Sequence, residues 1–331
     1  MRLLLVTSLA IVVAAAAGAE AQSGPSFDCA KASNVVERAV CKDADLAKAD
    51  RELASLYTAL QGRLTGAAKE SLEKNQVSWI VSRNRSCSAS EPDMTTYCLK
   101  KRYEERIADL KASGAGTYPF VEAQTIEKRG KVGKVNYSID ILYPRFAGKT
   151  ADFSAVNKVY ADNAAKAARE TTPTADPGVE RPQEWSAMGS YALYRPGPDA
   201  ITVASDFWSY TGGAHGNGAI ACRLVDLRTG KAVAPEAVFA PGDQWLKALV
   251  ALTAADLKRQ FVENPGFDDA LKPASLAKLL REGGHYCWQA GKLQLYFNAY
   301  EVGPYAAGAY TVDIPYARLR SHLRAGSPIA P

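Results

Sequence analysis

The six cysteines of this chain constrain its fold more than any other feature. They are Cys29, Cys41, Cys87, Cys98, Cys222 and Cys287. Four lie in the N-terminal third and two lie far downstream, so the chain divides into two regions by its cysteines alone. An even number of cysteines in an exported chain is typical of a disulfide framework. We therefore expect three disulfides, with each region closing its own.

Under that assumption Cys222 pairs with Cys287, and three pairings remain for the other four cysteines. Cys29 and Cys41 flank a helix predicted from Ser33 to Val40. A straight helix of this length would hold the two Cα atoms farther apart than the ~7 Å that a disulfide can span. A pairing between helices is therefore mildly favoured, although the sequence does not decide it.

The N-terminus has the three-part pattern of a secretory signal peptide. Arg2 precedes an apolar stretch from Leu3 to about Ala17, and Ala19-Glu20-Ala21 follows as a small-x-small cleavage site. The apolar stretch is short for a membrane span, which needs about 20 residues. We expect cleavage near Ala21, with residues 1–21 removed, and a soluble periplasmic or secreted protein without a membrane span.

The charge of the chain is mildly basic and evenly spread. Its 40 Lys and Arg residues against 35 Asp and Glu residues give a formal net charge of +5. Nucleic-acid binding usually needs basic residues clustered on one face. No such run occurs in the sequence, so we expect no nucleic-acid partner.

Residues 26–111 have the pattern of a small helical bundle. The predicted helices are 33–40 with Ser33 as N-cap, 43–64 with Asp43 as N-cap, 67–85 and 95–111. Their apolar residues recur at three-, four- and seven-residue spacings. Two disulfides would compensate for the limited core of a bundle this small.

The spacing of cysteines, Trp and Arg in this region resembles a known family. The motifs are Cys29…Glu37-Arg38-Ala39-Val40-Cys41, Leu46…Asp50…Leu53…Tyr57, Gln76…Trp79…Arg83…Cys87, and Cys98-Leu99…Tyr103-Glu104-Glu105-Arg106-Ile107. Together they resemble the N-terminal domain of LprI-type lysozyme inhibitors. The resemblance implies an envelope protein that can bind lysozyme-type muramidases.

Three polar residues of this region are candidates for a special role: Asp50, Gln76 and Arg83. We interpret them as a structural polar cluster inside the bundle rather than as a binding site, because a buried charge without its partner would be costly.

Beyond a linker predicted at residues 112–118, the pattern changes to strands mixed with helices. We expect strands at 135–141, 185–194, 200–209 and 219–225, helices at 153–170, 245–261 and 273–281, a strand–turn–strand unit at 293–314, and a short helix at 316–323. Strands adjacent in sequence favour a mainly antiparallel sheet. The fold class is therefore α+β, with a helical bundle at 26–111 and an α+β domain at 119–325.

The stretch Phe207 to Gly218 combines two aromatic residues with a cluster of glycines around His215. Glycine clusters favour a tight chain reversal or a close contact of backbones. A hairpin whose histidine caps the turn is the default interpretation. The aromatic residues beside the turn favour a second one, a recognition loop on a rigid sheet.

A second resemblance rests on this stretch and on a later one. The motifs are Tyr210-Thr211-Gly212-Gly213-Ala214-His215-Gly216, Leu227…Thr229-Gly230-Lys231, and Phe297…Tyr300-Glu301-Val302-Gly303-Pro304-Tyr305-Ala306-Ala307-Gly308…Ile314-Pro315-Tyr316. They resemble the extracytoplasmic domain shared by the lysozyme-sensing anti-sigma factor RsiV and the peptidoglycan deacetylase PdaC. The resemblance implies a domain that can capture lysozyme. Neither transmembrane signalling nor deacetylation is implied.

Candidate partner-binding residues follow from both motifs: Trp208, Tyr210, Gly212, Gly213, His215, Tyr300, Glu301 and Tyr305. Aromatic anchors dominate many interfaces. Core packing is the alternative for each aromatic residue. A chain with net charge +5 gains no long-range attraction toward basic lysozymes, so binding would depend on local acidic or aromatic groups.

No motif of an enzyme is present. The sequence lacks H-E-x-x-H and G-x-S-x-G, and oxidised cysteines leave few zinc ligands. We expect no metal, no cofactor and no catalysis, and the leading hypothesis is capture or inhibition of a lysozyme-type muramidase. A module that binds peptidoglycan or another glycan is the alternative, and a hydrolase that uses His215 as general base is a third. The sequence does not name the lysozyme class, the binding domain or the oligomeric state.

Overall fold

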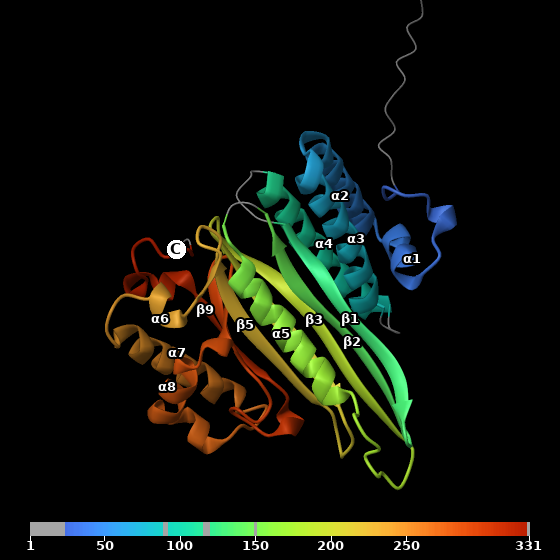
Figure 1. Cartoon of the computed structure of the whole chain (residues 1–331). Helices are drawn as coiled ribbons and strands as arrows, with labels where there is room; N and C mark the ends of the chain where they lie inside the picture. The colour runs from blue at the N-terminus through green and yellow to red at the C-terminus, as the bar shows by residue number, and fades with distance from the viewer. Residues whose placement is uncertain (1–23, 89–91, 115–119, 149–150, 330–331) are drawn as a thin grey trace, which may run out of the picture.

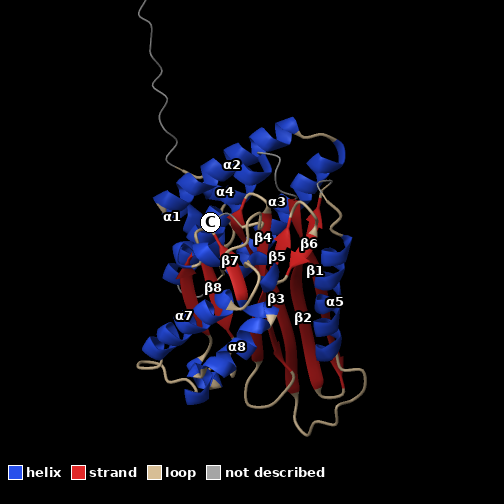
Figure 2. Ribbon diagram, turned by 90° about the vertical axis from the view of Figure 1, so that its left-hand side faces the viewer, coloured by secondary structure: helices blue, strands red, loops and turns tan. Residues whose placement is uncertain are grey.

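A computed structural model describes residues 24–88, 92–114, 120–148 and 151–329 (Figure 1). The expected signal peptide at 1–21 lies outside the described residues. The expected linker at 112–118 overlaps the end of a helix at Gly114, and its remainder also lies outside them. Helices at the N-terminus pack beside a long sheet, and a smaller sheet with its own helices follows (Figures 1 and 2).

The helical region consists of a 3₁₀ turn and four helices. They are η1 (Cys29–Lys31), α1 (Val35–Lys42), α2 (Ala44–Arg63), α3 (Gly66–Ser86) and α4 (Pro92–Gly114). Asn34, not Ser33, is the N-cap of α1: its side chain accepts from the Glu37 N–H at 2.9 Å. Glu37 reaches back to the Ser33 N–H at 2.7 Å, so both residues satisfy free donors of the first turn. Asp43 caps α2 as expected.

Two disulfides close this region, Cys29–Cys41 and Cys87–Cys98. The mild preference for a pairing of Cys29 or Cys41 with another helix was wrong. Cys29 belongs to η1, and the chain turns before α1 begins at Val35. The turn carries Cys29 back beside the end of α1, where its Cα lies 5.9 Å from that of Cys41. The argument from a straight helix failed because the helix starts later than predicted.

The larger sheet has six strands in sequential order. They are β1 (Phe120–Val132), β2 (Val135–Ala147), β3 (Gln183–Gly197), β4 (Ala200–Tyr210), β5 (Asn217–Asp226) and β6 (Lys231–Val233). All neighbours are antiparallel except β2 and β3, which are joined by helix α5 (Ser154–Thr171). Parallel neighbours need such a crossover, and α5 lies along one face of the sheet (Figure 1). The expected α+β class with mainly antiparallel strands is confirmed, whereas β1 was not predicted.

A second sheet and its helices complete the chain. The strands are β7 (Tyr286–Gln289), β8 (Lys292–Phe297) and β9 (Tyr310–Pro315), and the helices are α6 (Pro235–Val238), α7 (Gln244–Gln260) and α8 (Pro273–Arg281). Short 3₁₀ turns are η2 (Asp268–Leu271), η3 (Gly283–His285), η4 (Tyr305–Ala307), η5 (Tyr316–Arg318) and η6 (Arg320–His322). The last two replace the short helix expected at 316–323.

A disulfide and a side-chain amide are among the contacts between the two sheets. The Cys222–Cys287 disulfide, expected from the cysteine division, joins β5 to β7. The side chain of Asn298 donates to the Ile220 carbonyl at 3.1 Å and accepts from the Ile220 N–H at 2.7 Å. One amide thus satisfies both backbone groups of a residue in β5.

Candidate functional site

A buried chain of hydrogen bonds joins two of the three polar residues singled out in the helical region. The Tyr103 hydroxyl donates to Asp50 at 2.8 Å and accepts from Arg83 at 2.8 Å. Asp50 also accepts from the backbone and hydroxyl of Ser26. The Arg83 guanidinium lies over the rings of Trp79 and Tyr103. Burial raises the pKa of Tyr103, so its hydroxyl stays protonated and can bridge the two charges.

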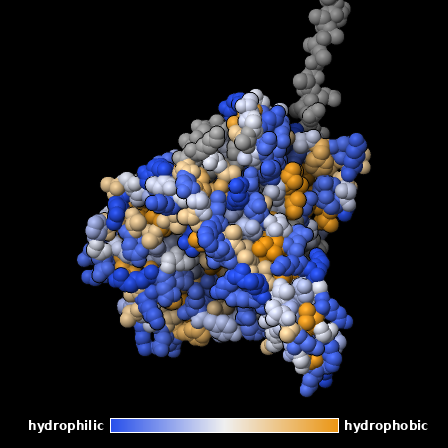
Figure 3. Space-filling view, in the orientation of Figure 1, coloured by the Kyte–Doolittle hydropathy of each residue, from blue (hydrophilic) through white to orange (hydrophobic). Residues whose placement is uncertain are grey.

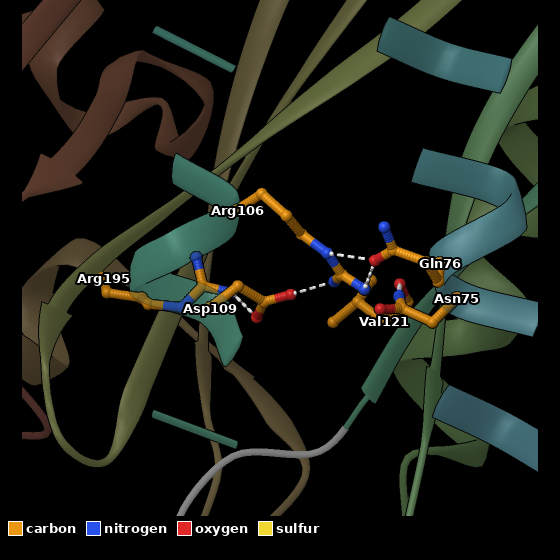
Figure 4. Close-up of polar contacts among 6 residues, drawn as sticks. All are labelled: Asn75, Gln76, Arg106, Asp109, Val121 and Arg195. Carbon is orange, nitrogen blue, oxygen red and sulfur yellow. Dashed lines mark hydrogen bonds and ion pairs between the residues drawn. The ribbon is translucent and has the colours of Figure 1, made fainter. Parts of the chain in front are cut away.

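The third residue, Gln76, lies outside this cluster. Its side-chain oxygen accepts two bonds from Arg106, at 2.9 and 3.2 Å (Figure 4). Arg106 also donates to Asp109 at 2.6 Å, and Asp109 in turn accepts from Arg195 of β3. Asn75 of α3 donates to the Val121 carbonyl of β1 (Figure 4). These contacts fasten α3 and α4 to the sheet.

The surface of the helical region that faces away from this junction carries exposed apolar residues. Val77, Ile80 and Val81 of α3 are 62%, 38% and 46% exposed, and Val35 of α1 is 45% exposed. Apolar surface gathers over α3 and α1 in the space-filling view (Figure 3). We call these four residues the apolar patch. Exposed apolar patches on a folded protein often mark a binding surface.

A groove of about 530 Å³ lies between η1, α1, α2 and α3, next to the apolar patch. Ile80 belongs to both the patch and the groove lining, and Tyr57 and Trp79 add aromatic surface. Asp50 and Glu37 also line the groove. Its volume is in the range of small-molecule sites, and its mixed lining also suits an inserted side chain or loop of a partner.

The glycine stretch forms the loop between β4 and β5, and the structure brings it against the second motif. The His215 ring stacks on Tyr305 with centroids 3.8 Å apart. The Tyr305 hydroxyl donates to the Gly216 carbonyl at 2.8 Å, and the Tyr300 hydroxyl lies 3.4 Å from His215 Nε2. Trp208 and Tyr210 stack beside them with centroids 6.5 Å apart. We call Trp208, Tyr210, His215, Tyr300 and Tyr305 the aromatic corner.

The glycines allow this arrangement for two physical reasons. Gly212 and Gly213 have φ of +98° and +94°, a conformation that residues with a side chain rarely adopt. A Cβ at Gly216 would lie 2.3 Å from the Trp208 ring, so the indole packs directly on the loop backbone. The loop is therefore a hairpin turn that also holds an aromatic surface.

The residues of the two motifs differ in their exposure and in the contacts that they make. Tyr300 is 57% exposed with φ of +71°, so it stands out from the corner in a conformation uncommon for tyrosine. Glu301 points inward instead: its carboxylate accepts from the Asn298 N–H at 2.6 Å and lies 3.5 Å from His285 Nδ1. His215 Nδ1 donates to the Gly216 carbonyl at 2.9 Å. Tyr300 is thus the most accessible tyrosine of the corner, while Glu301 holds its loop in place.

Sequence reasoning missed three residues at the junction and the bridging role of Tyr103. Arg106, Asp109 and Arg195 are 3%, 9% and 11% exposed in their side chains. Arg106 and Asp109 are three residues apart on α4, a spacing that places them on one helix face. That spacing could have indicated the Arg106–Asp109 pair from the sequence. The contact with Arg195, which lies on a distant strand, could not have been predicted in this way.

No group of three or more His, Cys, Asp or Glu side chains that could hold a metal occurs among the described residues. In the same part of the chain, no helix is both long and apolar enough to cross a bilayer.

Fold and sites together define a two-part protein: a disulfide-bonded helical region packed on an α+β region that carries an aromatic corner. Residues 29–110 match the family model described as lysozyme inhibitor LprI. Residues 236–317 match a family described as protein of unknown function, DUF3298. The resemblance of the N-terminal region is confirmed, and the second match covers the C-terminal part of the span expected for the α+β region.

Curated relatives are similar to a part of the chain only. The lipoprotein LprI of Mycobacterium tuberculosis (strain H37Rv) and that of Mycobacterium bovis are each 30% identical over 95 residues. The aligned part is 29% of this chain and 45% of each relative, so the chain spans less than half the length of these proteins.

Two solved structures are similar to a larger part of the chain. A DUF3298 family protein from Pseudomonas aeruginosa is 18% identical, with a TM-score of 0.46, over 64% of this chain and 97% of its own. A member of the same family from Bacteroides fragilis is 15% identical, with a TM-score of 0.43, over 63% of this chain and 94% of its own.

Proposed function

We propose that this protein acts outside the cytoplasm, where it binds a lysozyme-type muramidase through its helical region and inhibits it. The observation that carries the proposal is the match of residues 29–110 to a lysozyme-inhibitor family, on a region whose surface bears an apolar patch and a groove. Three disulfides and the signal-peptide pattern support an exported protein.

The apolar patch supplies the contact area in this proposal. Ile80 and Val81 lie three and four residues after Val77, so the three side chains share one face of α3. The aromatic lining of the adjoining groove would receive a partner side chain at the centre of the contact. Interfaces commonly combine an apolar centre with a polar rim.

Local charge, not net charge, would orient the partner. A chain of net charge +5 does not attract a basic enzyme over long distances. Glu37 beside the groove is held ionised because the Ser33 N–H and hydroxyl lower its pKa. Asp28 lines the same groove. A basic loop of the enzyme would meet these carboxylates at short range.

Binding without catalysis is part of the proposal. His215 is the candidate base of the hydrolase hypothesis, and its ring is stacked on Tyr305 and bonded to the loop backbone at Gly216. These contacts support a role in holding the loop. Loss of a measurable turnover in His215→Ala would support the hydrolase instead.

A lysis assay tests the proposal. The mature protein, mixed in excess with goose-, chicken- and invertebrate-type lysozymes, should slow the clearing of a cell-wall suspension and co-elute with at least one of them. Full lysis in every mixture, with no co-elution, would contradict it.

A matched pair of variants locates the surface. Ile80→Glu places a charge on the apolar patch and should weaken inhibition about tenfold or more. Val262→Glu is the control, because Val262 is 82% exposed and lies after α7, in the α+β region. Equal inhibition by the two variants would show that this face of α3 is not part of the contact with the enzyme.

A second candidate function is glycan binding by the aromatic corner. The partly exposed Trp208 and Tyr210, with the exposed Tyr300, form stacking surfaces of the kind that sugar rings pack against. Pull-down on purified cell wall should be reduced in the Trp208→Ala, Tyr210→Ala double variant. Retention equal to that of the unmodified protein would rule out this corner as the glycan site.

A further inference from the structure

A cleft on the face of the larger sheet that α5 covers has no part in either function above. It consists of two adjoining hollows, of about 540 and 310 Å³, that share Tyr160, Asn163, Ser205 and Ala221 in their linings. Helix α5 forms one wall and β4 with β5 forms the floor. The opposite wall of the larger hollow comes from α6 and η3. Both volumes are in the range of ligand sites.

The cleft is separate from the aromatic corner although both use β4. Successive side chains of a strand point to opposite faces of the sheet. Ser205 and Phe207 face α5, and Phe207 packs with the apolar cluster beneath that helix. Trp208, the next residue, belongs to the other face, where it packs on Gly216. The two sites can therefore be altered independently.

One polar group in this cleft is buried and has no partner. The Tyr160 side chain is 5% exposed, and its hydroxyl makes no hydrogen bond to any described residue. Burial also raises the pKa of this hydroxyl, so it is a proton donor at neutral pH. Buried polar groups without partners are rare in folded proteins, and each calls for an explanation. A bound oxygen acceptor would provide one, provided that it displaces the atoms that cover the hydroxyl.

The cleft offers donors near Tyr160, although carboxylates also line it: Glu236 in the larger hollow, and Glu170 with Asp206 in the smaller one. Arg223 of β5 is exposed and forms no ion pair with a described residue, unlike Arg281 across the cleft, which lies 3.1 Å from Asp243. The Ser205 hydroxyl and the Asn163 amide line both hollows. A free guanidinium beside hydroxyl and amide donors suits a carboxylate, which arginine can bind through two parallel bonds.

The edge of β5 indicates what kind of molecule carries that carboxylate. A peptide would bind most simply by pairing with a free strand edge. At Ile220 both backbone groups are already bonded to Asn298, and from Leu224 to Asp226 the edge is paired with β6. The side-chain hydroxyl and amide groups remain available, and they suit the hydroxyl and acetamido groups of a sugar.

We propose that this cleft binds a carboxylate-bearing oligosaccharide, with Arg223 on the carboxylate and with Tyr160, Asn163 and Ser205 on its oxygen atoms. The site uses no residue of the apolar patch. Failure of muramidase inhibition would leave it untouched, and failure of glycan binding would leave the inhibitor proposal untouched.

Calorimetric titration of the mature full-length protein tests this site with three probes. The first is the disaccharide of N-acetylglucosamine and N-acetylmuramic acid, which carries one carboxylate. The second is chitobiose, a neutral disaccharide, and the third is the acidic tripeptide Glu-Glu-Glu. We expect the muramyl disaccharide to bind at least about tenfold more tightly than either of the others.

Variants locate the binding. Arg223→Gln should weaken the binding of the muramyl disaccharide about tenfold or more, and Tyr160→Phe should weaken it several-fold. Tyr160→Phe should not lower the melting temperature, because the hydroxyl it removes has no partner in the protein. Arg259→Gln on α7 is the control and should change nothing.

Four results would overturn the proposal: no binding of the muramyl disaccharide, equal binding of chitobiose, tighter binding of the tripeptide, or unchanged affinity in both cleft variants. If chitobiose and the muramyl disaccharide both bind, a competition experiment between them on the Trp208→Ala, Tyr210→Ala variant would show whether the binding that they share comes from the aromatic corner instead.

Discussion

The helical region and the aromatic corner use similar residues for opposite purposes. In the helical region Arg83, Tyr103 and Asp50 bond to one another and are all buried. In the corner His215 and Tyr300 also approach one another, but both are exposed, in the loops that follow β4 and β8. Both sets of residues belong to sequence motifs that combine aromatic with polar side chains.

The difference teaches that a motif of polar and aromatic residues does not by itself mark a binding surface. In the helical region Asp50, Arg83 and Tyr103 of the family motif are buried and hold the bundle together. The exposed apolar patch offered to a partner lies outside the motif, while the motif residues Glu37 and Trp79 line the adjoining groove. In the corner the motif residues are themselves the accessible surface. Substitutions of the buried motif residues should therefore change stability in the first region, whereas substitutions of the motif residues in the corner should change affinity.

The largest effect is expected at the junction that fastens the helical region to the sheet. Asp109→Ala removes the carboxylate that the buried Arg106 and Arg195 share, which should lower the free energy of unfolding by about 3–5 kcal/mol. Urea denaturation measures it. Asp256→Ala, which removes the carboxylate partner of the 75% exposed Arg259, is the control and should cost about 1 kcal/mol or less. Equal costs for the two variants would mean that the junction does not bear on stability.

Removal of the Cys29–Cys41 disulfide should lower the free energy of unfolding by slightly less. Replacing both cysteines by serine opens a loop with a sequence separation of 12, which should lower the free energy of unfolding by about 3 kcal/mol. Thermal unfolding under oxidising conditions measures the change. Unchanged stability would argue that these thiols are not paired in the native protein, and mass spectrometry after alkylation checks that directly.

A smaller loss of stability is expected from a substitution inside the helical region. Tyr103→Phe removes the hydroxyl between Asp50 and Arg83 and should cost about 1–3 kcal/mol. Tyr97→Phe is a matched control, because Tyr97 is 66% exposed on the same helix. If Tyr103→Phe left stability intact and reduced inhibition instead, the cluster would be a binding site and the contrast drawn above would fail.

The smallest effect on stability is expected at the aromatic corner. Tyr300→Ala removes a largely exposed side chain and should change the free energy of unfolding by about 0.5 kcal/mol or less. Retention on purified cell wall should nevertheless fall if the corner binds glycan. A loss of stability as large as that of Tyr103→Phe would show that the corner is a structural core like the bundle cluster.

The sequence predicted the fold class and most helices because apolar spacing and caps are local signals. Asp43 was assigned as an N-cap and is one. Strand β1 was missed because Glu122, Gln124, Glu127 and Lys128 interrupt its apolar pattern, and its position depends on pairing with β2 and on contacts with α3. The Cys29–Cys41 pairing was missed because it depends on a turn before α1 that has no strong sequence signal.

For the candidate sites, the two motifs of the aromatic corner were placed in contact by the fold, although they lie about 90 residues apart in the sequence. Their glycines and aromatic residues were recognisable. The cleft beside α5 was not predictable, because Tyr160 has the spacing of an ordinary core residue on an amphipathic helix. Its unsatisfied hydroxyl exists only once β4 and β5 are in place.

Amide hydrogen exchange of the mature protein, alone and in complex with the lysozyme it inhibits most strongly, tests the central claim most directly. The account predicts slower exchange in α1 and α3 in the complex and unchanged exchange in residues 207–218 and 300–308. Slower exchange confined to those two segments, with α1 and α3 unchanged, would contradict it and assign lysozyme capture to the aromatic corner.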